Sequence, residues 1–177
     1  MIRSLFKRKS ATKTSTPTEE ITFVPEPILD TDPTIDRICQ FVREEGYVPF
    51  KQSDNLVVFK IQGETYYTCW QEKSRWASIR KGFDLEEEDI LPAMIAAHDI
   101  MTHWALIRIY VDEKDQDITF SVEQFCDSMD EYRPFFSRAL DIIDSDLGLF
   151  AKSFDEARAK RNESARMFLS QNNIIPS

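Results

Sequence analysis

Short runs of β-branched and aromatic residues alternate with polar corners between Asn55 and Phe83. Three such runs cover 55–61, 65–71 and 76–80, and turn-forming residues close each of them. This texture is typical of an antiparallel meander, in which each strand pairs with the next. Apolar side chains fall on both faces of these strands. One face therefore packs on helices, and the other is either covered by the chain itself or exposed as an aromatic patch of the kind that marks an interaction site.

The outward face of the meander is the first candidate for a functional surface. The strand pattern alone leaves the pairing register open, and the register decides which side chains point outward. We predict that the outward, protein-interacting set consists of Leu56, Val58, Tyr66 and Trp70.

One helix is predicted before the meander in the sequence, and another after it. In the first, over 34–45, apolar residues recur at helical spacing and form one stripe: Ile35, Ile38, Cys39 and Val42. The second begins in the acidic segment 84–89, where acids face the positive end of the helix dipole. It runs to about Thr102 and is apolar over a wide arc, which predicts that it is largely buried.

A hairpin and a long helix are predicted to complete the chain. The hairpin pairs 105–111 with 118–125, and each strand alternates apolar and polar positions. In the last helix, residues spaced by four and three form a heptad seam: Phe136, Leu140, Ile143, Leu147, Phe150, Phe154 and Ala157. Gly148 leaves open whether this helix is continuous. Its far half packs either against the first helix or against a second copy.

These elements predict an α+β domain, an antiparallel sheet of a three-strand meander plus a hairpin packed against helices. Their order is helix, three strands, helix, two strands, helix. We place this domain at 34–157. Residues 1–33 are predicted to form a disordered tail, first basic and then rich in Ser, Thr and Pro. Residues 158–177 are predicted to form a charged helical extension.

Charge excludes one class of partner and leaves another open. The chain has a net charge of −9, and such a surface repels phosphate backbones, so no nucleic-acid partner is expected. The sequence has no run of about 18 apolar residues, so no membrane span is predicted. The first 17 residues, by contrast, carry five basic residues and no acid. This segment is either a solvated tail or a weak contact to anionic membrane, which would make the chain a peripheral membrane-tethered adaptor.

Glycine and cysteine usage argue against cofactor and metal sites. The chain has four glycines, where an average composition of about 7 % gives roughly a dozen. No two lie close enough to form a dinucleotide-binding, P-loop or hydrolase-elbow motif. Cys39, Cys69 and Cys126 are far apart and form no zinc-ligand spacing. They predict reduced thiols and a cytoplasmic location, and we expect no cofactor and no metal.

His98 and His103 are the two histidines of the chain. They are five positions apart, whereas a metal pair on one helix face needs a spacing of three or four. A small hydrolase or lyase that uses His98 or His103 with carboxylates from 84–99 stays an alternative, because such a site needs only two groups within hydrogen-bond reach. We predict no catalytic residue and a chain that is not an enzyme.

The element order and three short segments carry a family resemblance. With Glu44-Glu45-Gly46-Tyr47, then 55–59 (Asn-Leu-Val-Val-Phe) and 66–68 (Tyr-Tyr-Thr), the chain resembles the YbjN-like family of bacterial sensory transduction regulators over about 34–157. The resemblance implies a fold similar to type III secretion chaperones, no catalytic residues, and a cytoplasmic protein that binds other proteins. We therefore predict a non-enzymatic protein–protein interaction module with a regulatory or chaperone-like role, of unknown partner, with homodimer formation as a further expectation.

Overall fold

The computed structural model describes residues 32–103 and 106–171. The predicted tail thus lies outside the described residues except for Asp32 and Pro33, and so do 172–177. The helices are α1 (Ile35–Glu44), α2 (Ile90–His103) and α3 (Met129–Gln171), with short 3-10 turns at Glu72–Ser74 and Glu87–Asp89. The strands are β1 (Phe50–Ser53), β2 (Leu56–Ile61), β3 (Glu64–Gln71), β4 (Trp76–Asp84), β5 (Arg108–Asp112) and β6 (Asp117–Phe125).

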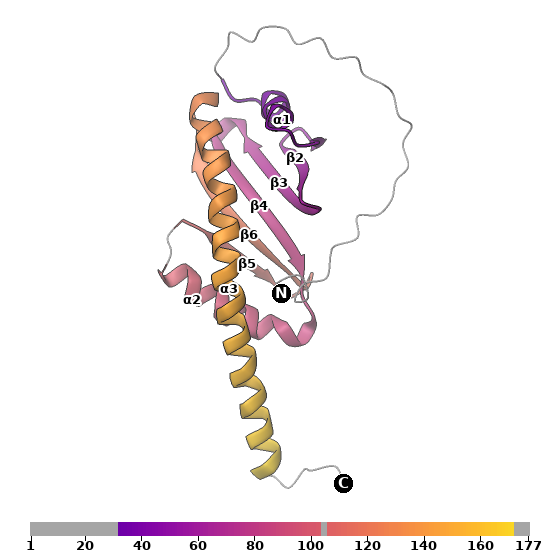
Figure 1. The fold of residues 1–177 in the computed structure, drawn as a ribbon, viewed down its shortest axis with the longest axis vertical. Helices are drawn as coiled ribbons and strands as arrows, with labels where there is room; N and C mark the ends of the chain where they lie inside the picture. The colour runs from indigo at the N-terminus through magenta and orange to yellow at the C-terminus, as the bar shows by residue number, and fades with distance from the viewer. Residues whose placement is uncertain (1–31, 104–105, 172–177) are drawn as a thin grey trace, which may run out of the picture.

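All six strands form one antiparallel sheet in the order β1-β2-β3-β4-β6-β5 (Figure 1). The meander and the hairpin join through the pairing of β4 with β6. The predicted α+β class and element order are confirmed, with one strand more than predicted. That strand, β1, precedes the predicted meander and pairs with β2.

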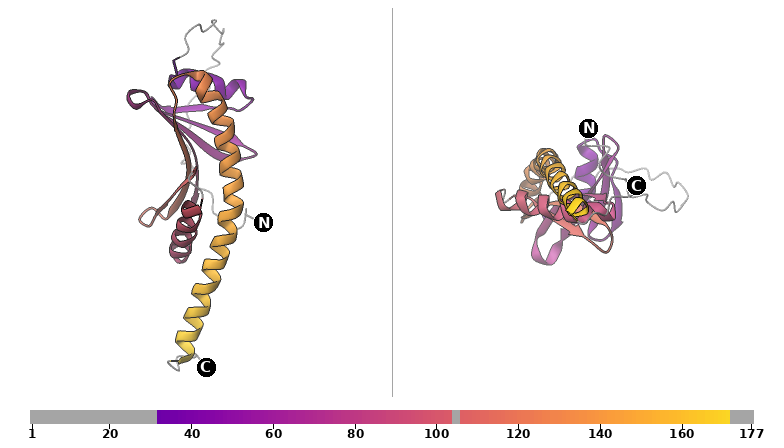
Figure 2. Two further views of the ribbon diagram at one scale, coloured as in Figure 1. Left: turned by 90° about the vertical axis from the view of Figure 1, so that its left-hand side faces the viewer. Right: turned by 90° about the horizontal axis from the view of Figure 1, so that it is seen from below.

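Two helices cover one face of the sheet, and α2 lies beside α3 at the β5 end (Figure 2). The first helix packs on β1 and β2, α3 packs on β4 and β6, and α2 packs on α3 and β5. No helix of the described residues lies across the opposite face of the sheet (Figure 2). We call the helix-covered side the inner face and the other side the outer face.

The first helix forms where its sequence signals predict. Thr34 caps its start, because the Thr34 hydroxyl accepts a hydrogen bond from the Arg37 backbone N–H at 3.3 Å. Gly46 follows its end with a φ of +89°, a left-handed conformation that glycine adopts at little cost. The predicted stripe faces the core, with Ile38 and Val42 fully buried.

A single 43-residue helix, α3, supports the inner face. All seven residues of the predicted seam are at most 9 % exposed, so the seam is confirmed. Phe136 contacts Phe41 and Phe59, and Phe150 contacts Phe120, which ties the helix to α1, β2 and β6. The helix is continuous through Gly148 and past the predicted domain boundary at 157. Its end projects beyond the sheet (Figures 1 and 2).

The predicted outward set is wrong for two of its four members. Tyr66 and Trp70 are each 2 % exposed and lie on the inner face. The reason is a two-residue turn at Gln62 and Gly63, both with positive φ, which pairs Ile61 with Glu64. Even-numbered residues of β2 therefore lie opposite odd-numbered residues of β3.

With this register, Leu56 pairs with Cys69 and Val58 pairs with Tyr67. Cross-strand partners share a face, so these four side chains point outward together. Leu56 and Val58 thus do lie on the outer face, and their role as interaction residues stays a prediction.

Candidate functional site

The second helix buries its three alanines together with Ile90 and Ile100, and it leaves its other large apolar side chains exposed. Ala93, Ala96 and Ala97 are at most 3 % exposed and lie in the core. Four larger side chains are instead 40–57 % exposed: Leu91, Met94, Ile95 and Met101. We call these four the α2 surface. The prediction that this helix is largely buried is therefore wrong, because the apolar arc is wider than the area that α3 and β5 cover.

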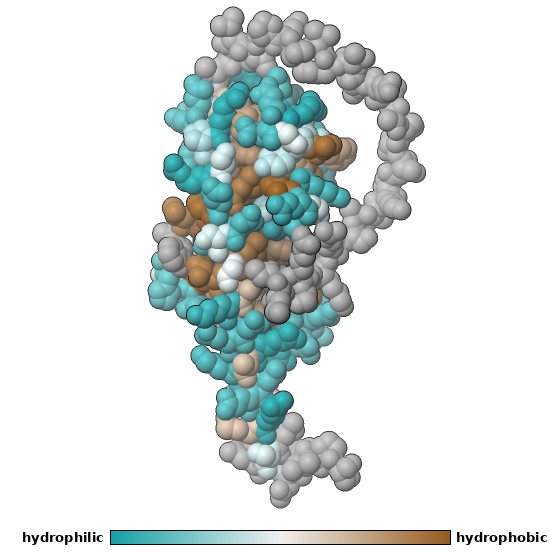
Figure 3. All heavy atoms as spheres, viewed as in Figure 1, coloured by the Kyte–Doolittle hydropathy of each residue, from teal (hydrophilic) through white to brown (hydrophobic). Residues whose placement is uncertain are grey.

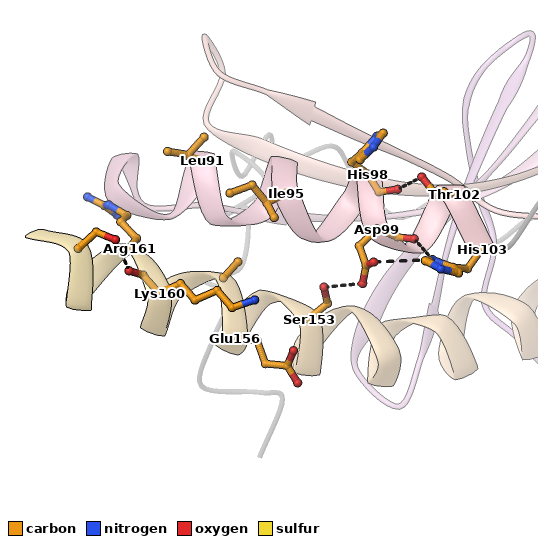
Figure 4. A pocket seen from close by; sticks show the side chains of 12 residues that line it. Leu91, Ile95, His98, Asp99, Thr102, His103, Ser153, Glu156, Lys160 and Arg161 are labelled. Atoms are coloured by element: carbon orange, nitrogen blue, oxygen red, sulfur yellow. Dashed lines mark hydrogen bonds and ion pairs between the residues drawn. The ribbon is translucent and has the colours of Figure 1, made fainter.

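A groove separates the exposed side of α2 from the C-terminal half of α3 (Figure 4). It has a volume of about 690 Å³, and Leu91, Ile95 and Ala157 contribute apolar lining. Lys160 and Arg161 contribute basic groups from α3. Hydrophobic side chains gather around the middle of the molecule, while the projecting end of α3 is mainly hydrophilic (Figure 3).

Both histidines line this groove, together with Asp99 and Ser153. The Ser153 hydroxyl donates to the Asp99 carboxylate at 3.0 Å. His103 Nδ1 lies 2.8 Å from the Asp99 backbone carbonyl and 3.7 Å from its carboxylate. His98 projects away from α3 (Figure 4).

This arrangement does not form a nucleophile–base pair. In a hydroxyl-activating triad the imidazole lies between the hydroxyl and the carboxylate, so that it can take the hydroxyl proton. Here the carboxylate of Asp99 lies between Ser153 and His103. The close 2.8 Å approach of His103 Nδ1 is to a backbone carbonyl, which can only accept, so Nδ1 is a donor in that contact. The groove thus brings the residues of the hydrolase alternative together without the order that the chemistry needs.

The acidic segment before α2 anchors α3. Asp89 is 3 % exposed, and its Oδ1 lies 3.0 Å from Arg158 Nε. Burial raises the pKa of the Asp89 carboxyl, and the nearby Arg158 guanidinium opposes that rise. Glu88 also lies 3.5 Å from Arg158, and its backbone carbonyl accepts from Arg161. In the described part of the chain, no cluster of three or more histidine, cysteine or acidic side chains could hold a metal.

A polar network on the inner face, buried at Lys81 and Tyr66 and exposed at Asp144, was missed by the sequence reasoning. Lys81 is 7 % exposed, and its Nζ donates to the Tyr66 hydroxyl oxygen at 2.8 Å. The Tyr66 hydroxyl in turn donates to Asp144 Oδ1 at 2.6 Å. The sequence contained a signal that Lys81 is buried, because Lys81 follows Ala77 and Ile79 at every second position of the strand and therefore lies on the same face.

The outer face carries a second, smaller apolar area. Half-buried Leu56, Val58 and Trp76 lie on it, and Phe50 and Phe125 at its two margins are 68 % and 70 % exposed. Arg80 covers part of the area, with its guanidinium carbon 5.4 Å from the centre of the Trp76 ring.

The three cysteines are free thiols. Burial raises the pKa of the Cys126 thiol to about 11 and also raises the pKa of Cys39, so neither site favours a reactive thiolate. No described helix combines the length and the apolar character that crossing a membrane requires.

No protein-family model matches the sequence, and no curated protein matches it. Among solved structures, the fold is similar to the crystal structure of YbjN from E. coli, proposed to be a transcription regulator, with a TM-score of 0.53 and 10 % sequence identity. The match covers 73 % of this chain and 94 % of the YbjN chain. At this identity the likeness concerns the fold, and the predicted YbjN-like fold is confirmed.

Proposed function

We propose that this chain is a non-enzymatic protein–protein interaction module with a regulatory or chaperone-like role, and that a partner protein binds the α2 surface. The observation that carries the proposal is the exposed apolar side of α2. The exposure of Leu91, Met94, Ile95 and Met101 leaves large apolar side chains along one side of α2 in water, and exposed apolar areas of this kind are typical of interaction sites.

The composition of the α2 surface indicates what kind of partner fits it. Two of its four residues are methionines, whose unbranched side chains adapt to differently shaped apolar partners. An apolar or amphipathic segment of another protein supplies the matching surface. A regulatory role would operate through such protein contacts, since the net charge of −9 disfavours direct contact with DNA. The free thiols support a cytoplasmic location as part of the same proposal.

Affinity capture with three baits tests the proposal. The wild type is compared with Met94→Glu/Met101→Glu on the α2 surface and with Leu56→Glu/Val58→Glu on the outer face. Captured proteins are quantified by mass spectrometry, and circular dichroism confirms that each bait is folded. We expect at least one protein to be captured by the wild type and the outer-face variant and lost from the α2 variant. Identical capture by all three baits, or a loss confined to the outer-face variant, contradicts the proposal.

A further inference from the structure

Two acidic segments meet at the start of α2. The strand register pairs Asp84 with Asp117, and Asp117 with Asp112. The segments 84–89 and 112–117 are therefore neighbours, and together they contain nine acids and one lysine. Two arginines of α3 also contact this region, which leaves it negatively charged. We call the two segments the acidic corner. The α2 surface follows it directly in the chain, so exposed apolar side chains lie beside a concentration of negative charge.

A segment of the opposite charge lies in the part of the chain before the described residues. Residues 1–9 read Met-Ile-Arg-Ser-Leu-Phe-Lys-Arg-Lys, with four basic residues and no acid. A helix over this segment places Ile2, Leu5 and Phe6 on one face, which is the spacing that amphipathic helices use to bind apolar surfaces. The segment therefore combines an apolar face that matches the α2 surface with a charge that matches the acidic corner.

The segment can reach α2 from the point where the chain enters the described structure. Asp32 lies there, and its carboxylate is 3.5 Å from the guanidinium of Arg75. Arg75 directly precedes β4, which extends about 30 Å over its nine residues and ends beside the acidic corner. The residues 10–31 extend up to about 70 Å, more than twice that distance.

We propose that residues 1–9 bind the α2 surface of their own chain, with their apolar residues against its apolar side chains and their basic residues beside the acidic corner. The segment then covers this surface until a partner protein displaces it, which makes it an autoinhibitory element. This inference rests on the proposed function, because it concerns the regulation of the same surface. The tether gives the segment an effective concentration on the order of 1 mM, so a weak contact is sufficient.

The charges around α2 decide where on its surface the segment lies. Lys160 and Arg161 line the groove on its α3 side and repel a basic segment. Met94 and Met101 are exposed and do not line the groove. We therefore place the segment over the two methionines, where the adaptable thioether side chains meet its apolar face.

Photo-cross-linking within the purified full chain tests the proposal. A benzophenone amino acid replaces Phe6, the protein is irradiated at low salt, and the products are mapped by mass spectrometry of peptides. We expect cross-links to Met94 or Met101. Their yield is expected to stay constant when the protein is diluted, because both reacting groups belong to one chain.

Two controls separate specific binding from random contact. The same photoreactive amino acid at Phe23 lies in the segment 18–31, which has no basic residue, so it is expected to give no α2 product. In the chain labelled at position 6, Arg3→Glu/Lys7→Glu/Arg8→Glu is expected to lower the yield about fivefold or more. This triple variant leaves the α2 surface itself unchanged.

Several results would overturn the proposal. Cross-linked dimers whose yield rises with concentration would mean that the segment binds a second copy. Products that map to the outer face of the sheet would place the segment elsewhere. Equal α2 yields from positions 6 and 23, a yield that charge reversal leaves unchanged, or no α2 product at all would show that no specific contact forms.

The two proposals fail independently. Cross-linking of the purified chain reports on residues 1–9 whether or not a partner protein exists. Affinity capture reports on the partner whether or not residues 1–9 bind. Where both proposals hold, the triple charge-reversal variant captures more of the partner than the wild type does, because its α2 surface is no longer covered.

Discussion

The ammonium group of Lys81 donates a hydrogen bond of 2.8 Å to the hydroxyl oxygen of Tyr66 on the inner face of the sheet. Asp144 completes the arrangement, 2.6 Å from the Tyr66 hydroxyl and 3.5 Å from Lys81 Nζ. A buried ammonium is tolerated only when it is paired and hydrogen-bonded. Because the three residues come from β4, β3 and α3, the network fixes how the long helix lies on the sheet.

We predict that Tyr66→Phe destabilises the fold by about 1–3 kcal/mol, because the buried ammonium of Lys81 loses its closest acceptor. Urea unfolding gives the free energy of unfolding. In the background of Lys81→Met the same substitution is expected to cost less, since no buried charge is left to satisfy. Equal costs in the two backgrounds would show that the hydrogen bond does not couple the pair.

Two neighbouring positions on α2 test which side of the helix faces the core. Ala96 is fully buried in the core, so Ala96→Leu is expected to destabilise the protein by about 1–3 kcal/mol through overpacking. Met94, two positions away, is 50 % exposed, and Met94→Gln is expected to change the stability by about 0.5 kcal/mol or less. The opposite ranking in urea unfolding would mean that the helix is turned the other way.

Gly148→Ala is predicted to stabilise the protein by about 0.5–1 kcal/mol. Gly148 lies inside α3, and a Cβ added there meets no atom within 4 Å. Alanine loses less backbone entropy than glycine on forming a helix. Thermal unfolding of the two proteins measures the change. A lower melting temperature for the alanine variant would indicate a bend at this position instead of a continuous helix.

We predict that Asp146 makes the stability of the fold depend on pH. Burial raises the pKa of its carboxyl, so the folded protein binds this proton more tightly than the unfolded chain does. The ionised form therefore costs stability at neutral pH, and the cost disappears as the pH falls through the raised pKa. We expect Asp146→Asn to stabilise the protein at pH 7, with a gain that shrinks toward pH about 4. A gain that grows on acidification would reverse the sign of this argument.

The sequence predicted best those elements whose apolar period matches their burial. The α3 seam and the α1 stripe were predicted correctly, because each helix packs one face on one core. The prediction of which meander side chains point outward was wrong for two of the four residues, although the Gln62–Gly63 turn contained the information that sets the register. A two-residue turn sets the strand register, and the register would have placed Tyr66 and Trp70 inside.

The candidate site was harder to predict, because it depends on areas that remain uncovered after folding. Helix α2 is apolar around most of its circumference, so its sequence favoured burial without showing that the side with the alanines would face the core. The polar network of Lys81 was not predicted for a different reason, because its partner Asp144 is distant in the sequence. Only the tertiary structure brings the two charges within 3.5 Å.

Site-specific photo-cross-linking tests the central claim most directly. A photoreactive amino acid replaces Met94 on the α2 surface or, as a matched control, the exposed Lys73 at the β3–β4 corner. The Met94 substitution is also combined with His98→Ala/His103→Ala. After irradiation in cells, we predict discrete cross-linked proteins from position 94 in both histidine backgrounds, and none of these from position 73. The same weak, diffuse products from both positions would contradict the account, as would loss of the position-94 products when the histidines are removed.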